Sequence, residues 1–485
     1  MFLGIDIGTS SVKAVITNED GDVIDQATAP LMVSRPKDLW SEQNPDDWWK
    51  ATNKAVLDIS PDRRAKVEGI GLSGQMHGAT LIGDDDRPLR PAILWNDGRS
   101  FAQCAELEEI EPRSREITGN LAMPGFTAPK ILWVREHEPE IATKIRKVLL
   151  PKDYIRLLLT GTYAGEMSDA AGTLWLDVAN RKWSNEMLTA TGLDEDAMPE
   201  LFEGSEVTGM LKPEIASSWG MPSVPVAGGG GDNAAGAVGV GVISPGDAFL
   251  SLGTSGVLFV AGKEFVPNPE KGVHAFCHAL PEKWHEMTVM LSAASCVDWA
   301  ARLTGTNGAG ELIAAAEKAG RLDHPSVFLP YLSGERTPHN DPYARGVLFG
   351  LDHDSGAAEI GQAVLEGVAM AFAEGLSVLG EADHVREITV IGGGSRSNYW
   401  GRILAAALNR PLVYRRDSEV GPAYGAAKLA QIAVTGGDPS QIAAPPPVLD
   451  IVEPQASDVA LMAEKQERFA AIYKNLKELF PKETD

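Results

Sequence analysis

The sequence predicts an α/β protein made of two related domains with a catalytic cleft between them. The first observation is a strand that runs into a Gly-Thr-Ser turn and a second strand, at residues 2–16, and the second is its repetition at residues 249–260. In such a hairpin the glycine permits positive φ, and the hydroxyls and backbone N–H groups can face phosphate oxygens. The third observation is the alternation of strands and helices around both hairpins. We therefore expect two domains that close on one phosphate chain.

The length and composition fit two domains and exclude several kinds of partner. A chain of 485 residues is too long for one hydrophobic core, and we expect domains of residues 1–243 and 244–485. The net charge of −24 argues against nucleic acid or an anionic membrane surface, because both attract basic proteins. Three scattered cysteines, no evident signal peptide and no apolar run near ~20 residues predict a cytoplasmic protein with reduced thiols.

The first half of the chain is predicted to contain strands that end in polar loops. After the first hairpin, Asn44-Pro45 marks a helix that should run to about residue 58, because asparagine is a good N-cap and proline suits the first helical position. Residues 67–78 are predicted to form a buried strand followed by a polar loop, and residues 91–99 repeat this arrangement. Residues 101–160 are predicted to be mainly helical. Loops at strand ends are where α/β proteins bind ligands.

The later elements continue the alternation. A strand, a run of four glycines and a helix occupy residues 224–236, just before the expected domain boundary. After the second hairpin, helices, a strand that ends in glycines and a charged helical tail are predicted at about residues 292–303, 357–379 and 388–394 and from about residue 458. The tail is expected to pack at the periphery.

Two aspartates at strand ends are the candidate catalytic residues. Asp6 lies between two glycines beside the first turn, where a carboxylate can hold Mg²⁺ against phosphate oxygens or merely bond turn amides. Its neighbours Thr9, Ser10 and Lys13 favour the metal site. Asp232 follows the four glycines at a helix N-terminus, where the helix dipole keeps a carboxylate ionised and able to accept a proton. An ordinary N-cap explains Asp232 equally well from the pattern alone.

Two loops of the first half carry residue types suited to a polyol. Met76-His77 and Trp95-Asn96-Asp97 offer an imidazole, a carboxamide, a carboxylate and apolar walls, which bind hydroxyls and a carbon skeleton. A lone histidine is more often structural, so the pair of loops is the stronger observation. In the second half, Gly392–Gly394 lies between a strand and a helix and fits a nucleotide whose phosphate or ribose lies near backbone amides.

Several of these segments resemble the actin/hexokinase-like ATPase superfamily and, more narrowly, the FGGY family of carbohydrate kinases. The paired Gly-Thr-Ser turns, the glycines before Asp232 and Gly392–Gly394 carry the wider resemblance. The resemblance to the FGGY family is carried by residues 125–133 and 346–366. Within that family, the branch that phosphorylates D-xylulose is the most similar, and the similarity is carried by residues 40–43, 74–78, 95–99 and 332–338. The resemblance implies two actin/RNase H-like domains, of which the first binds sugar and the second binds nucleotide.

The resemblance also implies the chemistry. We expect ATP and Mg²⁺ to be used to phosphorylate D-xylulose at O5, which would feed xylose catabolism into the pentose phosphate pathway. Asp232 falls on the catalytic base, and Asp6 on the carboxylate associated with the metal and the phosphoryl group, with Asp232 as a second metal ligand. The residues expected at the sugar are Met76, His77, Trp95, Asn96, Asp232 and Asn233, and those expected at the nucleotide are Gly8, Thr9, Ser10, Lys13, Gly253, Thr254, Gly393, Gly394 and Asn398.

Two alternatives stay open. Glycerol kinases carry Arg-Glu where this chain has Met76-His77, so glycerol is not expected, whereas another ketose or polyol such as ribulose remains an alternative substrate. An actin-like or chaperone-like ATPase with a protein partner is the alternative from another class, and the two polyol-type loops disfavour it. We also allow for a homodimer.

Overall fold

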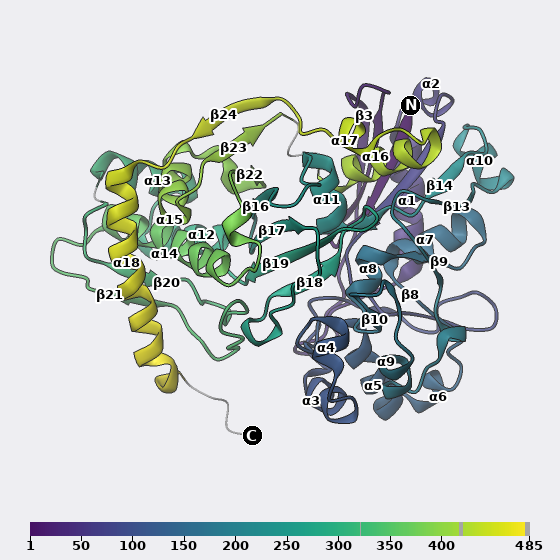
Figure 1. Cartoon of the computed structure of the whole chain (residues 1–485), viewed down its shortest axis with the longest axis horizontal. Coiled ribbons are helices and arrows are strands. Elements are labelled where there is room, and N and C mark those ends of the chain that lie inside the picture. The colour runs from purple at the N-terminus through teal and green to yellow at the C-terminus, as the bar shows by residue number, and fades with distance from the viewer. Residues whose placement is uncertain (321, 417–420, 481–485) are drawn as a thin grey trace.

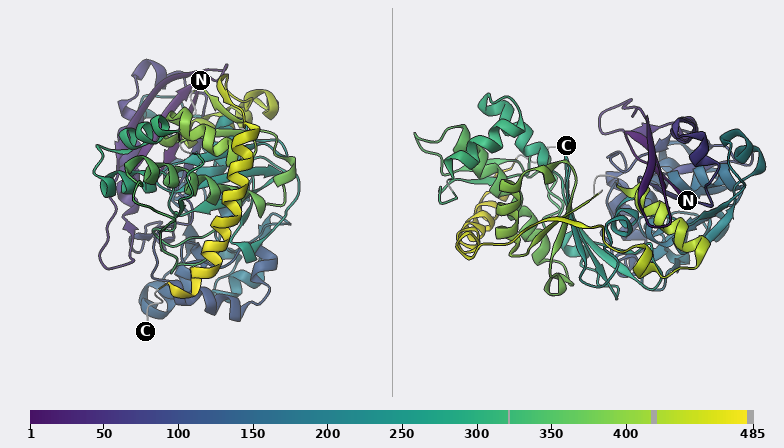
Figure 2. Two further views of the ribbon diagram at one scale, coloured as in Figure 1. Left: turned by 90° about the vertical axis from the view of Figure 1, so that its left-hand side faces the viewer. Right: turned by 90° about the horizontal axis from the view of Figure 1, so that it is seen from above.

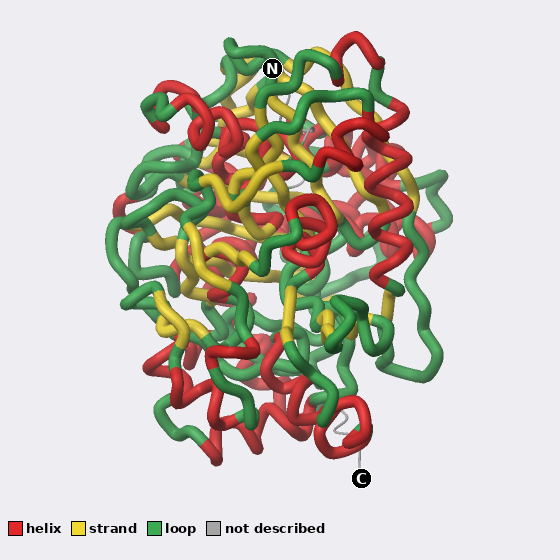
Figure 3. The backbone as a smooth tube through the Cα atoms, turned by 90° about the vertical axis from the view of Figure 1, so that its right-hand side faces the viewer, coloured by secondary structure: helices red, strands yellow, loops and turns green. Residues whose placement is uncertain are grey.

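The protein consists of two lobes, each centred on a mixed β-sheet (Figure 1). The computed structural model describes residues 1–320, 322–416 and 421–480, and of residues 395 and 396 it describes the backbone. Seen from above, the lobes lie side by side along the long axis of the molecule (Figure 2). In the N-terminal lobe, helices gather below the sheet, as Figure 3 shows.

The N-terminal sheet begins with the first predicted hairpin. Its strands are β1 (Phe2–Ile7), β2 (Ser11–Thr17), β3 (Val23–Pro30), β5 (Gly69–Gly74), β13 (Val207–Met210), β14 (Pro225–Ala227) and β15 (Gly230–Gly231). The strand order is β13-β14-β5-β1-β2-β3, and β15 also pairs with β5. Strand β1 is antiparallel to β2 and parallel to β5. Its apolar side chains are buried, since helices cover both faces of this part of the sheet.

The C-terminal sheet begins with the second predicted hairpin. Its strands are β16 (Ala248–Leu252), β17 (Gly256–Gly262), β18 (His274–Cys277), β19 (Trp284–Met290), β22 (Ile388–Ile391), β23 (Leu412–Arg415) and β24 (Val448–Val452). The strand order is β18-β19-β17-β16-β22-β23-β24. Strand β16 is antiparallel to β17 and parallel to β22.

The two sheets therefore share one pairing pattern, in which the first hairpin strand lies between its antiparallel partner and a later parallel strand. Both Gly-Thr-Ser segments are the turns of these hairpins. The Gly8 N–H donates to Ser11 O at 3.0 Å, and the Gly253 N–H donates to Ser255 O at 3.1 Å. The predicted α/β architecture with two related sheets is confirmed.

The helices of the first half surround the N-terminal sheet and extend below it. They include α1 (Pro45–Asp58), α3 (Phe101–Ile110), α4 (Ser114–Thr118), α5 (Thr127–His137), α6 (Pro139–Ala142), α7 (Pro151–Thr160), α8 (Met167–Ala171), α9 (Asn185–Ala190), α10 (Pro213–Trp219) and α11 (Asp232–Val240). Helix α1 begins and ends where the sequence predicted, because the Asn44 side chain accepts a hydrogen bond from Asp46 N and the buried Trp48 anchors the helix to the sheet.

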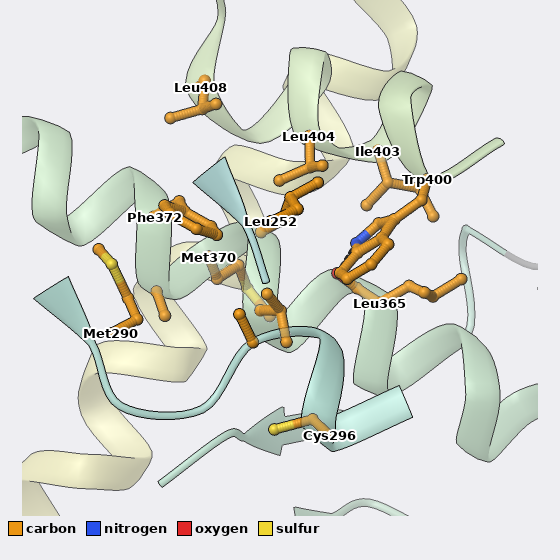
Figure 4. Packing of buried hydrophobic residues seen from close by; sticks show 14 of the residues in the cluster. Leu252, Met290, Cys296, Leu365, Met370, Phe372, Trp400, Ile403, Leu404 and Leu408 are labelled. Carbon is orange, nitrogen blue, oxygen red and sulfur yellow. Dashed lines mark hydrogen bonds between the residues drawn. The ribbon is translucent and has the colours of Figure 1, made fainter. Parts of the chain in front are cut away.

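The helices of the second half are α12 (Ala294–Thr304), α13 (Ala309–Ala319), α14 (Ala357–Ser377), α15 (Asn398–Leu408), α16 (Pro422–Thr435), α17 (Pro439–Ile442) and α18 (Ala456–Leu476). Helix α14 runs through the core of the C-terminal lobe and is buried from Gly361 to Phe372. Figure 4 shows Trp400 of α15 beside Leu365 of α14 in this core. The helices predicted at 292–303, 357–379 and from 458 are confirmed to within a few residues.

Helix α16 belongs to the second half of the sequence but covers the N-terminal sheet, and Figures 1 and 2 both show it beside the first strands. Glycines allow this close packing. A Cβ on Gly4 of β1 would lie 1.8 Å from Ala423 O, and one on Gly71 of β5 would lie 1.9 Å from Ala426 O. Helix α16 also crosses α11, where a Cβ on Gly425 would lie 1.7 Å from a carbonyl oxygen of α11.

Two further predictions concern the environment of the chain. Cys104, Cys277 and Cys296 are free thiols, and all three are buried. Within the described ranges, every helix is too short or too polar to cross a membrane.

Candidate active site

The two aspartates are held at the ends of neighbouring strands. Asp6 of β1 pairs in register with Ser73 of β5, and Ser73 pairs with Gly230 of β15. Asp232 follows two residues later as the first residue of α11. Because β1, β5 and β15 run parallel, their carboxyl ends meet at one edge of the sheet, where α/β proteins place ligand-binding groups.

The environment of both carboxylates opposes ionisation. Burial, followed by the negative charge of Asp232, raises the pKa of Asp6 to about 7, and the positive charge of Lys13 on β2 opposes this shift. Burial also raises the pKa of Asp232 to about 6. Asn233 opposes it, since its backbone N–H and side-chain amide donate to Asp232 Oδ1 at 2.7 and 3.0 Å. The repulsion between the carboxylates indicates a site suited to a shared cation.

One carboxylate oxygen at this edge lacks a protein partner. Asp6 Oδ1 is buried and accepts no hydrogen bond from any described residue. A divalent cation satisfies such an oxygen, because burial of an unpaired polar atom is costly. The described residues contain no cluster of three or more His, Cys, Asp or Glu side chains that could hold a metal. The two carboxylates at this strand edge fit Mg²⁺, which takes one or two carboxylates and keeps water and phosphate oxygens as its other ligands.

The first Gly-Thr-Ser turn is tied to two neighbouring loops through Thr9. Thr9 Oγ1 accepts a hydrogen bond from Trp95 Nε1 at 2.9 Å and donates to Gln75 Oε1 at 3.1 Å. The Thr9 side chain is therefore directed toward the polyol-type loops, while Gly8 is half-buried and Ser10 is exposed at the tip of the turn. The turn and both loops form one hydrogen-bonded unit.

Met76 and His77 lie in the loop after β5, with Gln75 between the strand and Met76. Met76 is buried against the glycine run, since a Cβ on Gly231 would lie 3.0 Å from Met76 Cγ. His77 has a left-handed backbone with φ of 67°, and its Nδ1 lies 2.5 Å from Gly172 O. Burial lowers the pKa of His77 to about 3, so the ring is neutral and Nδ1–H donates to that carbonyl. In this tautomer Nε2 is the acceptor.

A buried lysine that the sequence analysis assigned no role anchors the His77 loop. Lys130 of α5 donates to His77 O and to Gly125 O, both at 2.8 Å, and Thr127 Oγ1 donates to His77 O at 3.2 Å. Burial lowers the pKa of Lys130 to about 7, and Asp97 opposes this shift. Lys130 and Thr127 lie in residues 125–133, a segment that resembles the FGGY family. That resemblance was the only sequence signal that could have pointed to their role.

The second lobe reaches the His77 loop through a group of aromatic rings. Phe126 lies between His77 and His274 of β18, with ring centroids 4.9 and 5.4 Å away. His274 Nε2 lies 3.3 Å from Arg336 Nη1, and its Nδ1 lies 3.2 Å from Asn120 Oδ1. Strand β18 and the loop around Arg336 are thus linked to the His77 loop through Phe126 and His274, a contact that the sequence analysis did not assign.

Trp95 and Asn96 are exposed at the edge of the N-terminal site, and Trp95 retains 40% of its accessible surface. Asp97, which follows Asn96, is not open to a ligand and instead holds the loop in place. Asp97 is buried, accepts a hydrogen bond from Ser41 N and pairs with Arg99 at 2.7 Å. This ion pair fixes the loop, so Trp95 is presented at a defined position beside the first turn.

A pocket of about 850 Å³ lies in the C-terminal lobe between α12, α13 and the start of α15. The predicted nucleotide residues Gly393, Gly394 and Asn398 all line it. The second Gly-Thr-Ser turn adjoins this region, because Gly253 O and Thr254 O accept hydrogen bonds from the first backbone N–H groups of α12. The pocket also has lining residues that the sequence analysis missed: Ala294, Val297, Asp298, Ala309, Gly310, Ile313, Ala314, Glu317, Ser397, Tyr399 and Trp400.

Comparisons with known proteins agree with this arrangement. Residues 1–239 match the N-terminal domain, and residues 248–434 the C-terminal domain, of the FGGY family of carbohydrate kinases. The chain therefore belongs to the FGGY family of carbohydrate kinases. Its fold is the two-domain fold of that family.

Among individual relatives, the chain is 54% identical over 480 residues to a protein named xylulose kinase from Escherichia coli, covering 98% of this chain and 99% of the relative. A crystal structure titled as a xyloylose kinase from Brucella ovis has a TM-score of 0.96 at 49% identity, with 99% of each chain covered. The xylulose kinase of Rhodospirillum rubrum has a TM-score of 0.91 at 28% identity, again with 99% of each chain covered.

Proposed function

We propose that the protein transfers the γ-phosphoryl group of ATP to O5 of D-xylulose, giving D-xylulose 5-phosphate and ADP. The observation that carries this proposal is the position of Asp232, which follows a glycine run packed against Met76 in the loop that also bears His77. Relatives named xylulose kinase at 54% identity support the choice of sugar. Such a product would supply phosphorylated pentose to later steps of xylose use.

In this proposal Asp232 orients the sugar hydroxyl and accepts its proton. The pKa of about 6 leaves Asp232 ionised at neutral pH. Phosphoryl transfer passes through a loose transition state, so positioning matters more than a strong base, and an ordinary carboxylate suffices. Asn233 supports the role, because its two hydrogen bonds hold Asp232 Oδ1 in place.

Asp6 is proposed to hold Mg²⁺, with Asp232 as its second carboxylate ligand. When bound, the metal would neutralise negative charge on the β- and γ-phosphate oxygens. The buried, unpartnered Asp6 Oδ1 supports this assignment. Lys13 and the turn Gly8 to Ser10 adjoin the same strand end, and the Gly8 N–H closes the hairpin by donating to Ser11 O. Lys13 and the backbone amides of Thr9 and Ser10 are proposed to face the phosphate chain.

The sugar is proposed to bind the N-terminal lobe and the nucleotide the C-terminal lobe, within domains of residues 1–243 and 244–485. Neutral His77 offers Nε2 as an acceptor for a sugar hydroxyl, Met76 and Trp95 supply apolar walls, and Asn96 a carboxamide. The residues proposed to contact nucleotide are Gly253, Thr254, Gly393, Gly394 and Asn398. The cytoplasmic location and a homodimer stay predictions of the sequence.

The test is a coupled ADP-release assay with Mg-ATP and D-xylulose, D-ribulose, L-ribulose, xylitol, glycerol or no sugar. We expect kcat/KM for D-xylulose to exceed that of every other compound. A clear preference for another polyol would refute the substrate and keep the kinase. ADP release that does not depend on sugar would instead favour the actin-like or chaperone-like ATPase.

Replacement of the base tests the mechanism. Asp232→Asn keeps the size of the side chain and one acceptor oxygen but removes its ability to take a proton, so kcat should fall ~10²–10⁴-fold. Sugar binding, measured by calorimetry, should survive. Asp46→Asn is a matched control, because Asp46 occupies the first turn of the surface helix α1 and should leave kcat unchanged. A kcat of Asp232→Asn within tenfold of wild type would remove Asp232 from the role.

A further inference from the structure

The C-terminal helix α18 lies outside the two segments that match the FGGY family, which end at residue 434. It packs along the C-terminal lobe against α14, α15 and β20, as Figure 1 shows. Its buried stripe consists of Met462, Lys465, Phe469 and Ile472, at helical spacing. A lysine in the middle of an apolar stripe requires a partner, because an unpaired buried charge is costly.

The partner of Lys465 is Glu366 of α14. Lys465 is 7% exposed and Glu366 is fully buried, and Lys465 Nζ pairs with Glu366 Oε2. The other oxygen, Glu366 Oε1, accepts a hydrogen bond from Gln362 Nε2 at 2.8 Å. Gln362 Oε1 in turn accepts one from the Tyr399 hydroxyl at 2.5 Å. A continuous buried chain of hydrogen bonds therefore joins α18 to the start of α15.

The chain of bonds has one direction. A lysine ammonium can only donate and a carboxylate can only accept, so the Gln362 amide must present its NH₂ to Glu366 and its oxygen to Tyr399. The Tyr399 hydroxyl must then be the donor. Each orientation depends on the previous one, and Lys465 sets the first. Loss of the Lys465 charge leaves the buried Glu366 carboxylate without a cation. The orientations of the Gln362 amide and the Tyr399 hydroxyl are then no longer fixed.

Tyr399 and its neighbour Trp400 line the 850 Å³ pocket of the C-terminal lobe, next to Asn398. The same turn of α14 holds both rings, since Trp400 Nε1 donates to Leu365 O at 3.1 Å. Figure 4 shows the Trp400 ring lying against α14 at this position. Residues 362–366 of α14 therefore hold Tyr399 and Trp400 in the wall of the pocket through hydrogen bonds, and Lys465 of α18 holds Glu366 through an ion pair.

We propose that Lys465 is a positioning residue for nucleotide binding: through Glu366 and Gln362 it holds Tyr399 in the wall of the nucleotide pocket. This inference rests on the proposed function, because it takes the pocket to be the ATP site. It assigns to α18 a role in nucleotide affinity and not only in stability. Lys465 itself does not line the pocket.

The test compares equilibrium binding of ADP and the KM values for ATP and sugar in the full-length protein. In Lys465→Met the charge is lost and the apolar stem is kept, so we expect ADP to bind about tenfold more weakly and KM for ATP to rise in step. The KM for sugar should stay within twofold of wild type. In Lys465→Met with Glu366→Gln, no buried charge is left unpaired, so the thermal midpoint should recover. ADP affinity should stay below that of wild type, because the amide that replaces the carboxylate can present either end to Gln362.

A matched control separates positioning from stability. Arg402 of α15 pairs with Asp458 of α18, with a distance of 3.0 Å between Arg402 Nη2 and Asp458 Oδ1. Arg402→Gln therefore weakens the same contact between the two helices without touching the buried chain. We expect it to lower the thermal midpoint and leave ADP affinity unchanged. Equal losses of ADP affinity in Arg402→Gln and Lys465→Met would overturn the proposal.

Two further outcomes keep the test decisive. If Lys465→Met does not fold, Tyr399→Phe removes only the last hydrogen bond of the chain and should still weaken ADP binding several-fold. ADP binding that is unchanged in Tyr399→Phe or in folded Lys465→Met refutes the positioning role alone. A wild-type protein that binds neither ADP nor ATP refutes the proposed function as well.

Discussion

Replacement of Gly425 by alanine should destabilise the protein, although alanine favours helices. Gly425 lies in α16 at its crossing with α11, and an added Cβ would lie 1.7 Å from Ala235 O, 2.6 Å from Ala235 C and 2.9 Å from Gly239 N. All three atoms belong to backbone, so no side chain can turn aside. To bring the shortest contact to 3.0 Å the helices would have to part by about 1.3 Å.

The magnitude follows from two opposing terms. Overpacking of a core costs ~1–3 kcal/mol, and a clash of backbone with Cβ belongs at the upper end. Alanine gains ~1 kcal/mol over glycine in a helix interior. The expected net loss is therefore ~2 kcal/mol, which would lower the thermal midpoint of a folding unit of this size by roughly 4–8 °C.

The assay is thermal unfolding of Gly425→Ala beside a control in the partner helix. Gly236 of α11 is also helical and buried, but a Cβ there would meet nothing within 4 Å. Gly236→Ala should therefore gain helix propensity without a clash and keep or raise the midpoint. The thermal midpoint should therefore fall in Gly425→Ala and stay the same or rise in Gly236→Ala. If Gly425→Ala unfolds at or above the wild-type temperature, the argument from the helix crossing is wrong.

Three further predictions concern the N-terminal site. Lys130→Met removes the donor to His77 O and should raise KM for sugar about tenfold, while an unchanged KM would contradict this. Trp95→Phe keeps an aromatic side chain but loses the indole N–H that donates a hydrogen bond to Thr9 Oγ1. Sugar affinity measured by calorimetry should therefore fall by ~0.5–1.5 kcal/mol, with little change in thermal midpoint. Since His77 has a pKa of about 3, the affinity ratio between wild type and His77→Gln should stay constant from pH 5.5 to 8; a step near pH 6.5 would show that His77 titrates.

The architecture was predictable from the sequence because its signals are local. The two hairpins, the Asn44 cap of α1 and the strand before Gly392 are each specified by a few adjacent residues, and each is where it was expected. Gly393 and Gly394 were singled out by the glycines between a strand and a helix, and Asn398 by the family resemblance; all three line one pocket, and their role at the nucleotide stays a prediction.

The supporting residues were not predictable, because their roles depend on contacts between distant segments. In the sequence Lys130 resembles any other helical lysine. Only the structure shows that Lys130 Nζ donates a hydrogen bond to His77 O. Gly172 carries no turn signal, and its lack of a side chain matters because His77 and Met76 lie against it. The pocket residues of α13 have no motif at all. The sequence pattern also placed the Thr9 hydroxyl toward phosphate, whereas it bonds Trp95 and Gln75.

The position of α16 determines how the chain can be divided. Residues 422–435 cover glycine-lined surfaces of β1 and β5, so a fragment that stops near residue 243 would lack part of its own interior. During synthesis, this face of the first sheet stays uncovered until residues 422–435 have been made. A chimera that exchanges residues 1–243 between two relatives should therefore carry α16 from the same parent, because the complementary surfaces lie far apart in the sequence.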